Sequence, residues 1–197
     1  MDREELGAWL RLTLCSGVGN QTARSLLAHF GLPQAIFGQT EAAWRQCVTP
    51  AQARALGTVP ETWTALLETT WRWLHDADTD TTTAAPRPAR TLITLGDRRY
   101  PTALLATEDP PLLLYAMGPA RFLADAPFPA QRCLAVVGSR NPTAQGAENA
   151  HAFSRALHGA GLTIVSGLAL GVDAAAHAGA LEAAHAPQDT PATIAVV

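Results

Sequence analysis

Lysine is absent from this chain of 197 residues, so all fourteen of its basic residues are arginine. A nucleotide-binding loop that reaches phosphates with a lysine is therefore excluded. The net charge of −3 argues against a broad basic surface, so any contact with a nucleic acid must be local. Cysteine is also scarce: the widely spaced Cys15, Cys47 and Cys133 form no Cys-x-x-Cys pair, which argues against a disulfide framework or a zinc site. His151 and His158 share a helix face but no obvious ligand lies beside them, so we expect both to be solvated.

Long apolar runs are missing as well. No stretch approaches the roughly 20 apolar residues that are needed to span a membrane. The N-terminus carries charges of both signs within residues 1–5 and lacks the apolar stretch of a signal peptide. With 48% hydrophobic residues the chain can still bury a core. We therefore expect a folded cytoplasmic protein without a membrane partner.

The chain is predicted to consist of two domains joined by a linker. Residues 1–75 have helical patterning, 76–90 form a polar and proline-bearing linker, and 91–197 alternate between strands and helices. Within the first domain, glycines at positions 17 and 19 separate two helices. Such a hairpin can offer backbone N–H groups to a DNA phosphate, or it can be only a tight turn, and Arg24 is the one basic residue near it. Both interpretations stay open.

The second domain is predicted to be an α/β fold with an extended Rossmann-like parallel sheet. After two early strands, each short β-branched run is followed by a helix that is rich in small residues. This alternation is typical of right-handed βαβ units. The expected elements are strands at 91–95 and 112–117, then strand 133–137, helix 143–158, strand 162–165, helix 174–185 and strand 193–197. No turn or helix follows the last strand, so we expect the domain to be incomplete at its C-terminal end.

Two strand-to-helix corners contain the candidate binding residues. Each corner ends a strand with small residues and opens a helix, which leaves backbone N–H groups free to bind an anion such as phosphate. Because parallel strands end at the same edge of a sheet, we expect the two corners to lie side by side. The candidate residues are Gly138, Ser139, Arg140 and Asn141 in the first corner, and Ser166, Gly167, Leu168, Ala169, Gly171, Asp173 and His177 in and after the second.

The first corner does not fit a dinucleotide cofactor. The Gly-x-Gly-x-x-Gly fingerprint is missing after the first strand, and Ser166 stands where an acidic residue should end the second. Arg140 follows two small residues at the head of a helix, where a guanidinium can hold a phosphate with two hydrogen bonds. The plainer alternative is an exposed arginine in a surface ion pair. Its position at the strand end favours phosphate binding, and we expect no cofactor.

The second corner contains a serine, an aspartate and a histidine. Asp173 stands where the residue that caps the following helix belongs, and it could also orient the imidazole of His177 one turn later. Ser166 could complete a hydrolase triad, but Ile164 occupies the place of the first glycine of Gly-x-Ser-x-Gly. We therefore expect a polar pocket that faces phosphate, without catalytic residues and without a metal ion.

Four motifs together resemble one known family, that of the DNA-processing protein DprA, also called Smf. The first is Val-Val-Gly-Ser-Arg, which ends at Arg140, and the second is Ile-Val-Ser-Gly-Leu-Ala-x-Gly-Val-Asp-Ala-Ala-Ala-His-x-Gly-Ala-Leu over 164–181. The others are Leu-Gly-Asp-x-x-Tyr-Pro-x-x-Leu over 95–104 and Pro-Pro-x-Leu-x-x-x-x-Gly over 110–118. The resemblance spans essentially the whole chain, and the long second motif is highly specific.

The resemblance implies a binding protein rather than an enzyme. It implies an N-terminal helical domain of the SAM-like or helix-hairpin-helix kind, and a pocket for single-stranded DNA at the strand ends. Members protect incoming DNA during natural transformation, help to load the RecA recombinase and form homodimers. It implies phosphate binding by both corners. The alternative is a nucleoside-phosphate hydrolase on a related sheet, although its Pro-Gly-Gly-x-Gly-Thr segment is absent from this chain.

Overall fold

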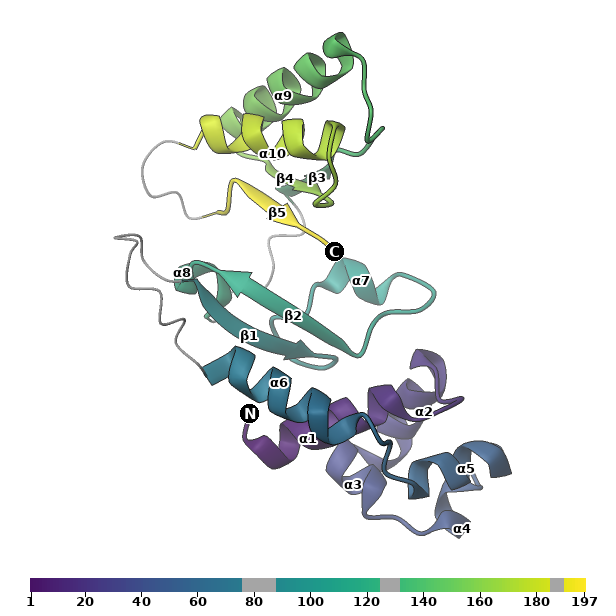
Figure 1. The fold of residues 1–197 in the computed structure, drawn as a ribbon. Helices are drawn as coiled ribbons and strands as arrows, with labels where there is room; N and C mark the ends of the chain where they lie inside the picture. The colour runs from purple at the N-terminus through teal and green to yellow at the C-terminus, as the bar shows by residue number, and fades with distance from the viewer. Residues whose placement is uncertain (76–87, 125–131, 185–189) are drawn as a thin grey trace. The chain divides into compact units, whose positions relative to one another are not determined.

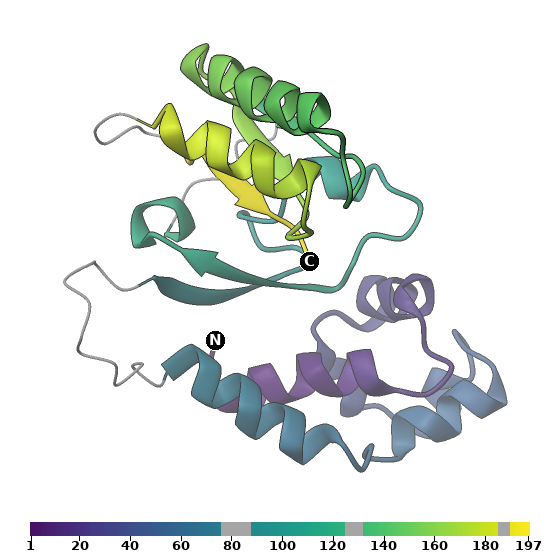
Figure 2. The ribbon, with the colours of Figure 1, turned by 45° about the horizontal axis from the view of Figure 1, so that its top comes forward.

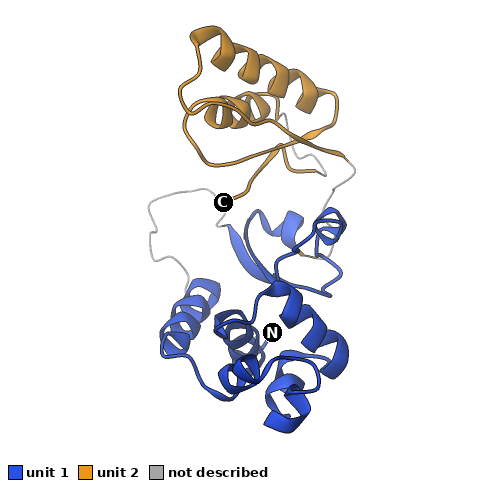
Figure 3. Ribbon diagram, turned by 90° about the vertical axis from the view of Figure 1, so that its right-hand side faces the viewer, with its two compact units in different colours: residues 1–123 blue, residues 124–197 orange. Residues whose placement is uncertain are grey.

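The computed structural model describes residues 1–75, 88–124, 132–184 and 190–197. The chain divides into two compact units, residues 1–123 and residues 124–197 (Figure 3). This division differs from the expected one, because the first unit contains the predicted helical domain and also the first two strands. Most of the expected linker, 76–90, lies outside the described residues, and its last two residues belong to a strand.

The first unit begins with six helices. They are α1 (Arg3–Leu14), α2 (Asn20–Phe30), α3 (Pro33–Phe37), α4 (Glu41–Trp44), α5 (Pro50–Gly57) and α6 (Trp63–His75). Asp2 caps α1 by accepting a hydrogen bond from the N–H of Glu5, and Gly31 ends α2 with a φ of 85°. Four apolar residues of α1 are almost fully buried and form the centre of this core: Leu6, Trp9, Leu10 and Leu12.

Two antiparallel strands complete the first unit, together with two short helices. These elements are β1 (Ala89–Thr94), α7 (Thr102–Leu105), β2 (Leu113–Gly118) and α8 (Ala120–Leu123), and β1 pairs with β2 along its whole length. Leu92 of β1 is 4% exposed and packs with Leu6 and Leu10 of α1 and with Leu67 of α6. The strands therefore share a hydrophobic core with the N-terminal helices (Figure 1).

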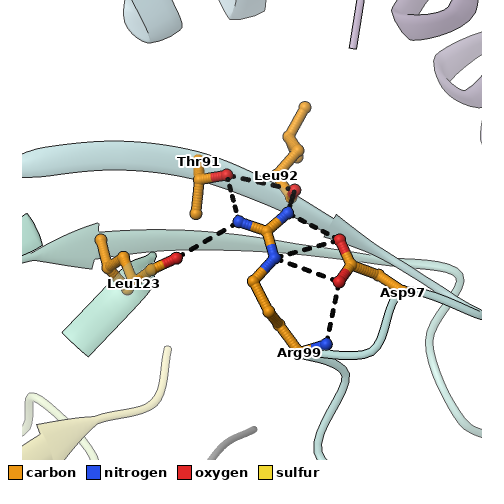
Figure 4. Close-up of polar contacts among 5 residues, drawn as sticks. All are labelled: Thr91, Leu92, Asp97, Arg99 and Leu123. Carbon is orange, nitrogen blue, oxygen red and sulfur yellow. Dashed lines mark hydrogen bonds and ion pairs between the residues drawn. The ribbon is translucent and has the colours of Figure 1, made fainter. Parts of the chain in front are cut away.

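The Leu-Gly-Asp-x-x-Tyr-Pro motif stabilises this unit internally. The guanidinium of Arg99 donates to both carboxylate oxygens of Asp97, with Nη2 2.6 Å from Oδ2, and to the carbonyl oxygens of Leu92 and Leu123 (Figure 4). Tyr100 is 4% exposed, and its hydroxyl donates to the carbonyl oxygen of Pro111 at 2.7 Å. The motif thus connects β1 to the segments that follow it, which gives it a structural role.

The Asp97–Arg99 pair predicts an acid-sensitive contribution to stability. Hydrogen bonds from Arg99 hold the pKa of Asp97 below its ordinary value. A lowered pKa in the folded state stabilises the fold above the unfolded pKa of about 4, and this stability is lost as the pH falls through the folded pKa. We expect Asp97→Asn to cost about 1–2 kcal/mol at pH 7, and progressively less below pH ~4. Urea unfolding between pH 7 and 3, followed by tryptophan fluorescence, measures this, because all five tryptophans lie in the first unit.

A matched control separates this effect from a general loss of charge. Glu41→Gln removes a carboxylate that pairs with Arg45 one turn later on the surface, and such exposed pairs contribute only a few tenths of a kcal/mol. A cost for Asp97→Asn that equals this control, or that does not change with pH, would contradict the assigned role of the Asp97 pair.

The second unit is a three-stranded parallel sheet with two helices. Its elements are β3 (Cys133–Ala135), α9 (Ala144–Gly159), β4 (Thr163–Ser166), α10 (Val172–Glu182) and β5 (Thr193–Ala195), with the strand order β3-β4-β5. Each strand in the sheet lies next to the one that precedes it in the chain, always on the same side. Right-handed connections therefore place both helices on the same face of the sheet. Figures 1 and 2 show α9 and α10 side by side on that face. The predicted α/β fold with a parallel sheet is thereby confirmed.

Small residues allow the two helices to pack closely over the sheet. Ile164, Ala176 and Ala180 form a fully buried cluster. Gly179 of α10 faces the backbone of α9 at the carbonyl of His151. His158 is only 2% exposed and its Nδ1 lies 2.9 Å from the carbonyl oxygen of Leu162, so the expectation that it is solvated was wrong. None of the helices in the described part of the chain is both long and apolar enough to traverse a membrane.

Candidate nucleic-acid interface

The first corner, residues 138–143, lies in the segment that connects the end of β3 at Ala135 to the start of α9 at Ala144. Asn141 donates its N–H to the hydroxyl oxygen of Ser139 at 3.0 Å, which turns the chain just before Pro142. Thr143 then caps α9, its hydroxyl accepting from the N–H of Gly146. Residues 138–141 are all exposed. The corner is therefore an open turn whose shape is held by its own short side chains.

The second corner connects β4 to α10 and is in direct contact with the first. The N–H of Val172 donates to the carbonyl oxygen of Ser139 at 3.1 Å. Gly171 has a φ of 85°, and a Cβ at this position would lie 2.6 Å from the carbonyl oxygen of Arg140. Likewise, a Cβ on Gly138 would lie 2.8 Å from Cγ2 of Val172. The structure thus brings the two corners together. Gly171 is required because the two backbones approach so closely, and Gly138 because the side chain of Val172 leaves no room for a Cβ.

The joined corners expose backbone donors at one edge of the sheet. Among the residues that the structure describes, nothing accepts a hydrogen bond from the N–H groups of Ser139 or Arg140, or from those of residues 167–171. These groups lie beside the first turns of two helices, whose dipoles favour negative charge. An anion bound here would satisfy several of them at once.

Arg140 differs from most arginines in the structure. Arg24 pairs with Asp109, Arg45 with Glu41, and Arg155 with Glu182. Arg140, in contrast, is exposed and makes no hydrogen bond or ion pair with any described residue. The surface ion pair that we considered as its plainer role is therefore absent from the described parts of the chain. Its guanidinium is free to meet a ligand beside the exposed N–H groups.

The second corner corrects two expectations about its polar residues. Gly171, rather than Asp173, caps α10, and Asp173 is the second residue of the helix. Asp173 also does not orient His177: the imidazole Nε2 lies 2.7 Å from the carbonyl oxygen of Gly167, and Nδ1 lies 2.6 Å from the hydroxyl of Thr193. Gly171 occupies the N-cap position because only glycine readily adopts the positive φ found there.

Ser166 is placed away from any hydrolytic role. Its hydroxyl is buried and donates to the carbonyl oxygen of Val136 at 2.6 Å, which links the ends of β4 and β3. Since His177 is bonded to Gly167 and Thr193, the serine and the histidine do not form a nucleophile–base pair. A Ser–His–Asp triad is therefore not assembled.

Residues between Ser166 and α10 form the outer part of the second corner. Leu168 and Leu170 are 68% and 79% exposed, whereas Ala169 between them is half-buried. Three residues of this region were not among those singled out from the sequence. They are the exposed Leu170, Val172 with its contact to Ser139, and Thr193 with its contact to His177. The position of Val172 directly after Gly171 was a usable signal for its contact with the first corner, but no local pattern indicated that Thr193 would meet His177.

The glycine hairpin of the N-terminal domain is bonded within its own unit. Arg24 of α2 donates to Oδ1 of Asp109 at 2.9 Å and to the carbonyl oxygen of Pro110 at 3.1 Å. Asn20 donates to the other carboxylate oxygen of Asp109 at 3.0 Å. The basic residue that could have assisted DNA binding at the hairpin is thus already paired, which favours the structural interpretation.

Comparisons with known proteins agree with the motifs that form the two corners. The family model for DNA recombination-mediator protein A matches residues 91–197, more than half of the chain. The chain belongs to the DNA recombination-mediator protein A family. The matched region contains both corners and both upstream motifs, so the resemblance that the sequence predicted is confirmed. The family description names a mediator of recombination rather than a chemical reaction.

Individual relatives match shorter regions of the chain. The chain is 35% identical over 91 residues to the DNA processing protein DprA of Bacillus subtilis, and the alignment covers 46% of this chain and 29% of that protein. It is 38% identical over 96 residues to protein Smf of Escherichia coli, and this alignment covers 49% of this chain and 24% of that protein. The aligned regions therefore cover less than a third of each of these two relatives.

A solved structure extends the similarity to nearly the whole chain. The X-ray structure of DNA processing protein A (DprA) from Streptococcus pneumoniae matches with a TM-score of 0.59 and 25% identity. The match covers 93% of this chain and 55% of that one. The described fold is therefore one that a solved relative shares.

Proposed function

We propose that this chain binds single-stranded DNA as part of DNA processing in recombination. The observation that carries the proposal is the joined pair of corners, where the N–H of Val172 donates to the carbonyl oxygen of Ser139 and exposed amides lie beside Arg140, which has no ion pair among the described residues. Backbone N–H groups at helix N-termini bind phosphate, and an arginine adds two charge-assisted hydrogen bonds. Membership in the DNA recombination-mediator protein A family supports the choice of DNA over a small nucleotide.

The proposed mechanism needs a flexible strand. Successive phosphates would meet the first corner, residues 138–141, and the second corner, residues 166–171, with Arg140 as the main charged anchor. Leu168 and Leu170 are exposed next to the amides and would contact the faces of unpaired bases. Such contacts tolerate any base, so binding would depend little on sequence. A duplex hides its base faces and would bind more weakly.

The biological role that we propose comes from the family resemblance. The complete protein would protect incoming single strands during natural transformation and assist loading of the RecA recombinase, as a cytoplasmic homodimer. These partners are proposed for the whole protein, since the aligned regions cover less than a third of each of the curated relatives described above.

Arg140→Ala tests the charged anchor. We expect the affinity for an oligo-dT strand to fall by ~1–3 kcal/mol, or about 5-fold to 150-fold, because charge-assisted hydrogen bonds to one phosphate are lost. The slope of log K against log salt should also become shallower by about 0.7, the contribution of one contact with a single strand. Fluorescence anisotropy at two or more salt concentrations measures both quantities.

Arg155→Ala is the matched control, because it removes the same charge from α9 at an arginine that is paired with Glu182. It should leave both the affinity and the slope nearly unchanged. Equal losses in the two variants would mean that net charge, rather than the Arg140 contact, determines binding. Release of free base from nucleoside monophosphates by the wild-type chain would instead favour the hydrolase alternative.

A further inference from the structure

His177 has two hydrogen bonds that connect the second corner to the sheet. Its Nε2 lies 2.7 Å from the carbonyl oxygen of Gly167, and its Nδ1 lies 2.6 Å from the hydroxyl oxygen of Thr193. That hydroxyl is also 2.8 Å from the carbonyl oxygen of Ile164 in β4. The imidazole therefore lies between the loop at the end of β4 and the first residue of β5.

The chemistry of these partners determines where the protons are. A carbonyl oxygen can only accept, so Nε2 of His177 must carry a proton and donate it to Gly167. The hydroxyl of Thr193 has a single proton, which goes either to the carbonyl of Ile164 or to Nδ1. His177 is charged in the first case and neutral in the second, but the bond from Nε2–H to Gly167 exists in both. The contact with Gly167 is thus independent of the charge of the ring.

Holding this carbonyl also fixes the next amide. The structure contains no cis peptide bond among its described residues, so the peptide between Gly167 and Leu168 is trans. In a trans peptide the C=O and the N–H point in opposite directions. Because the carbonyl of Gly167 points at His177, the N–H of Leu168 points away from it. Within the described ranges this N–H has no acceptor.

Gly167 is enclosed from a second direction. A Cβ on Gly167 would lie 2.7 Å from Oδ2 of Asp173, whose side chain is buried. The peptide after Gly167 can therefore rotate little: His177 holds its carbonyl, and the carboxylate of Asp173 fills the space beside its Cα. Gly167 thus lies next to both the carboxylate of Asp173 and the imidazole of His177, while Thr193 and Ile164 contribute uncharged groups.

We propose that His177 is a positioning residue that directs the N–H of Leu168 toward a bound phosphate, without touching the DNA itself. This inference rests on the proposed binding of single-stranded DNA. From the sequence, His177 was grouped with the residues that contact phosphate directly. The role proposed here is different, because His177 would act only through Gly167 and Leu168. The donor on Nε2 is the group that matters, so a side chain that presents an N–H at the same place should replace it.

The test compares His177→Ala with His177→Gln, whose side-chain amide can donate to Gly167 in place of Nε2–H. We expect the alanine variant to bind oligo-dT about 10-fold more weakly and the glutamine variant to stay within about threefold of wild type. In protein labelled with 15N-leucine, the amide signal of Leu168 should shift when oligo-dT binds to the wild type and to His177→Gln, but much less in His177→Ala. A Leu168→Ile variant assigns that signal.

The outcomes separate this proposal from the proposed function. If the wild type binds oligo-dT and Arg140→Ala weakens binding, while His177→Ala binds normally with an unchanged Leu168 shift, the positioning role is wrong and the DNA-binding function stands. If the wild type does not bind oligo-dT, the proposed function itself fails. Hydrogen exchange of α9 and α10 is measured in each variant, which detects any unfolding of the second unit caused by His177→Ala. A glutamine variant that keeps this protection but loses the Leu168 shift would also overturn the proposal.

Discussion

Gly171→Ala is expected to destabilise the second unit by about 3–5 kcal/mol and to abolish measurable binding of single-stranded DNA. Two costs add at this position. A φ of 85° is strained for alanine, which costs on the order of 1–3 kcal/mol, and the new Cβ would overlap with the backbone of Ser139 and Arg140. Either the two corners separate or the loop is rebuilt, so the N–H groups no longer converge. Hydrogen exchange of residues 132–184 measures the destabilisation, and anisotropy with oligo-dT measures the binding.

Gly161→Ala provides a control for backbone strain alone. Gly161 follows α9 with a φ of 91°, but a Cβ there would meet nothing within 4 Å. It should cost only about 1–2 kcal/mol and leave DNA binding intact under conditions where the unit remains folded. Equal effects of the two substitutions would show that the contact between the corners contributes nothing beyond the conformation of glycine.

The joining of the two corners could be predicted from the sequence, but the roles of their side chains could not. Small residues at the ends of parallel strands place the turns at one edge, and the structure shows Val172 bonded to Ser139 as that argument requires. Which residue caps α10 depended on the φ of Gly171, since both Gly171 and Asp173 suit a helix start. One hydrogen-bond partner of His177 is Thr193, sixteen residues away, and no local period indicates such a contact.

The division of the chain into two units was also hard to predict, because it depends on contacts between residues that are distant in the sequence. A polar, proline-bearing stretch suggested a boundary before residue 91, yet Leu92 packs with Leu6 and Leu67 in one core. Local composition indicates whether a segment is exposed to solvent, whereas the core depends on contacts between residues distant in sequence. Arg24 and Asp109 form a second such contact, across eighty-five positions. It explains why the glycine hairpin, which was compatible with DNA binding, is already bonded within the first unit.

Gly179→Ala is the second substitution for which we expect a large effect, about 3 kcal/mol of lost stability in the second unit. In an open helix this change would stabilise by up to about 1 kcal/mol, because alanine has the higher helix propensity. Gly179, however, is buried in α10, and a Cβ there would overlap with the carbonyl group of His151 in α9. Backbone atoms cannot rotate aside as a side chain can, so the helices must move apart and lose contacts around Ala176 and Ala180. Hydrogen exchange of α9 and α10 measures the loss.

The sign of the effect is what makes this experiment decisive. Gly159→Ala places the same methyl group at the last residue of α9, where a Cβ would meet nothing within 4 Å, so it should be neutral or slightly stabilising. If Gly179→Ala were also neutral, the close packing of α9 on α10 would be wrong. Because α10 begins at the second corner, a helix displaced from α9 should also move the N–H of Val172 away from Ser139. We therefore expect Gly179→Ala to weaken binding of oligo-dT even though Gly179 lies two helical turns from the corner.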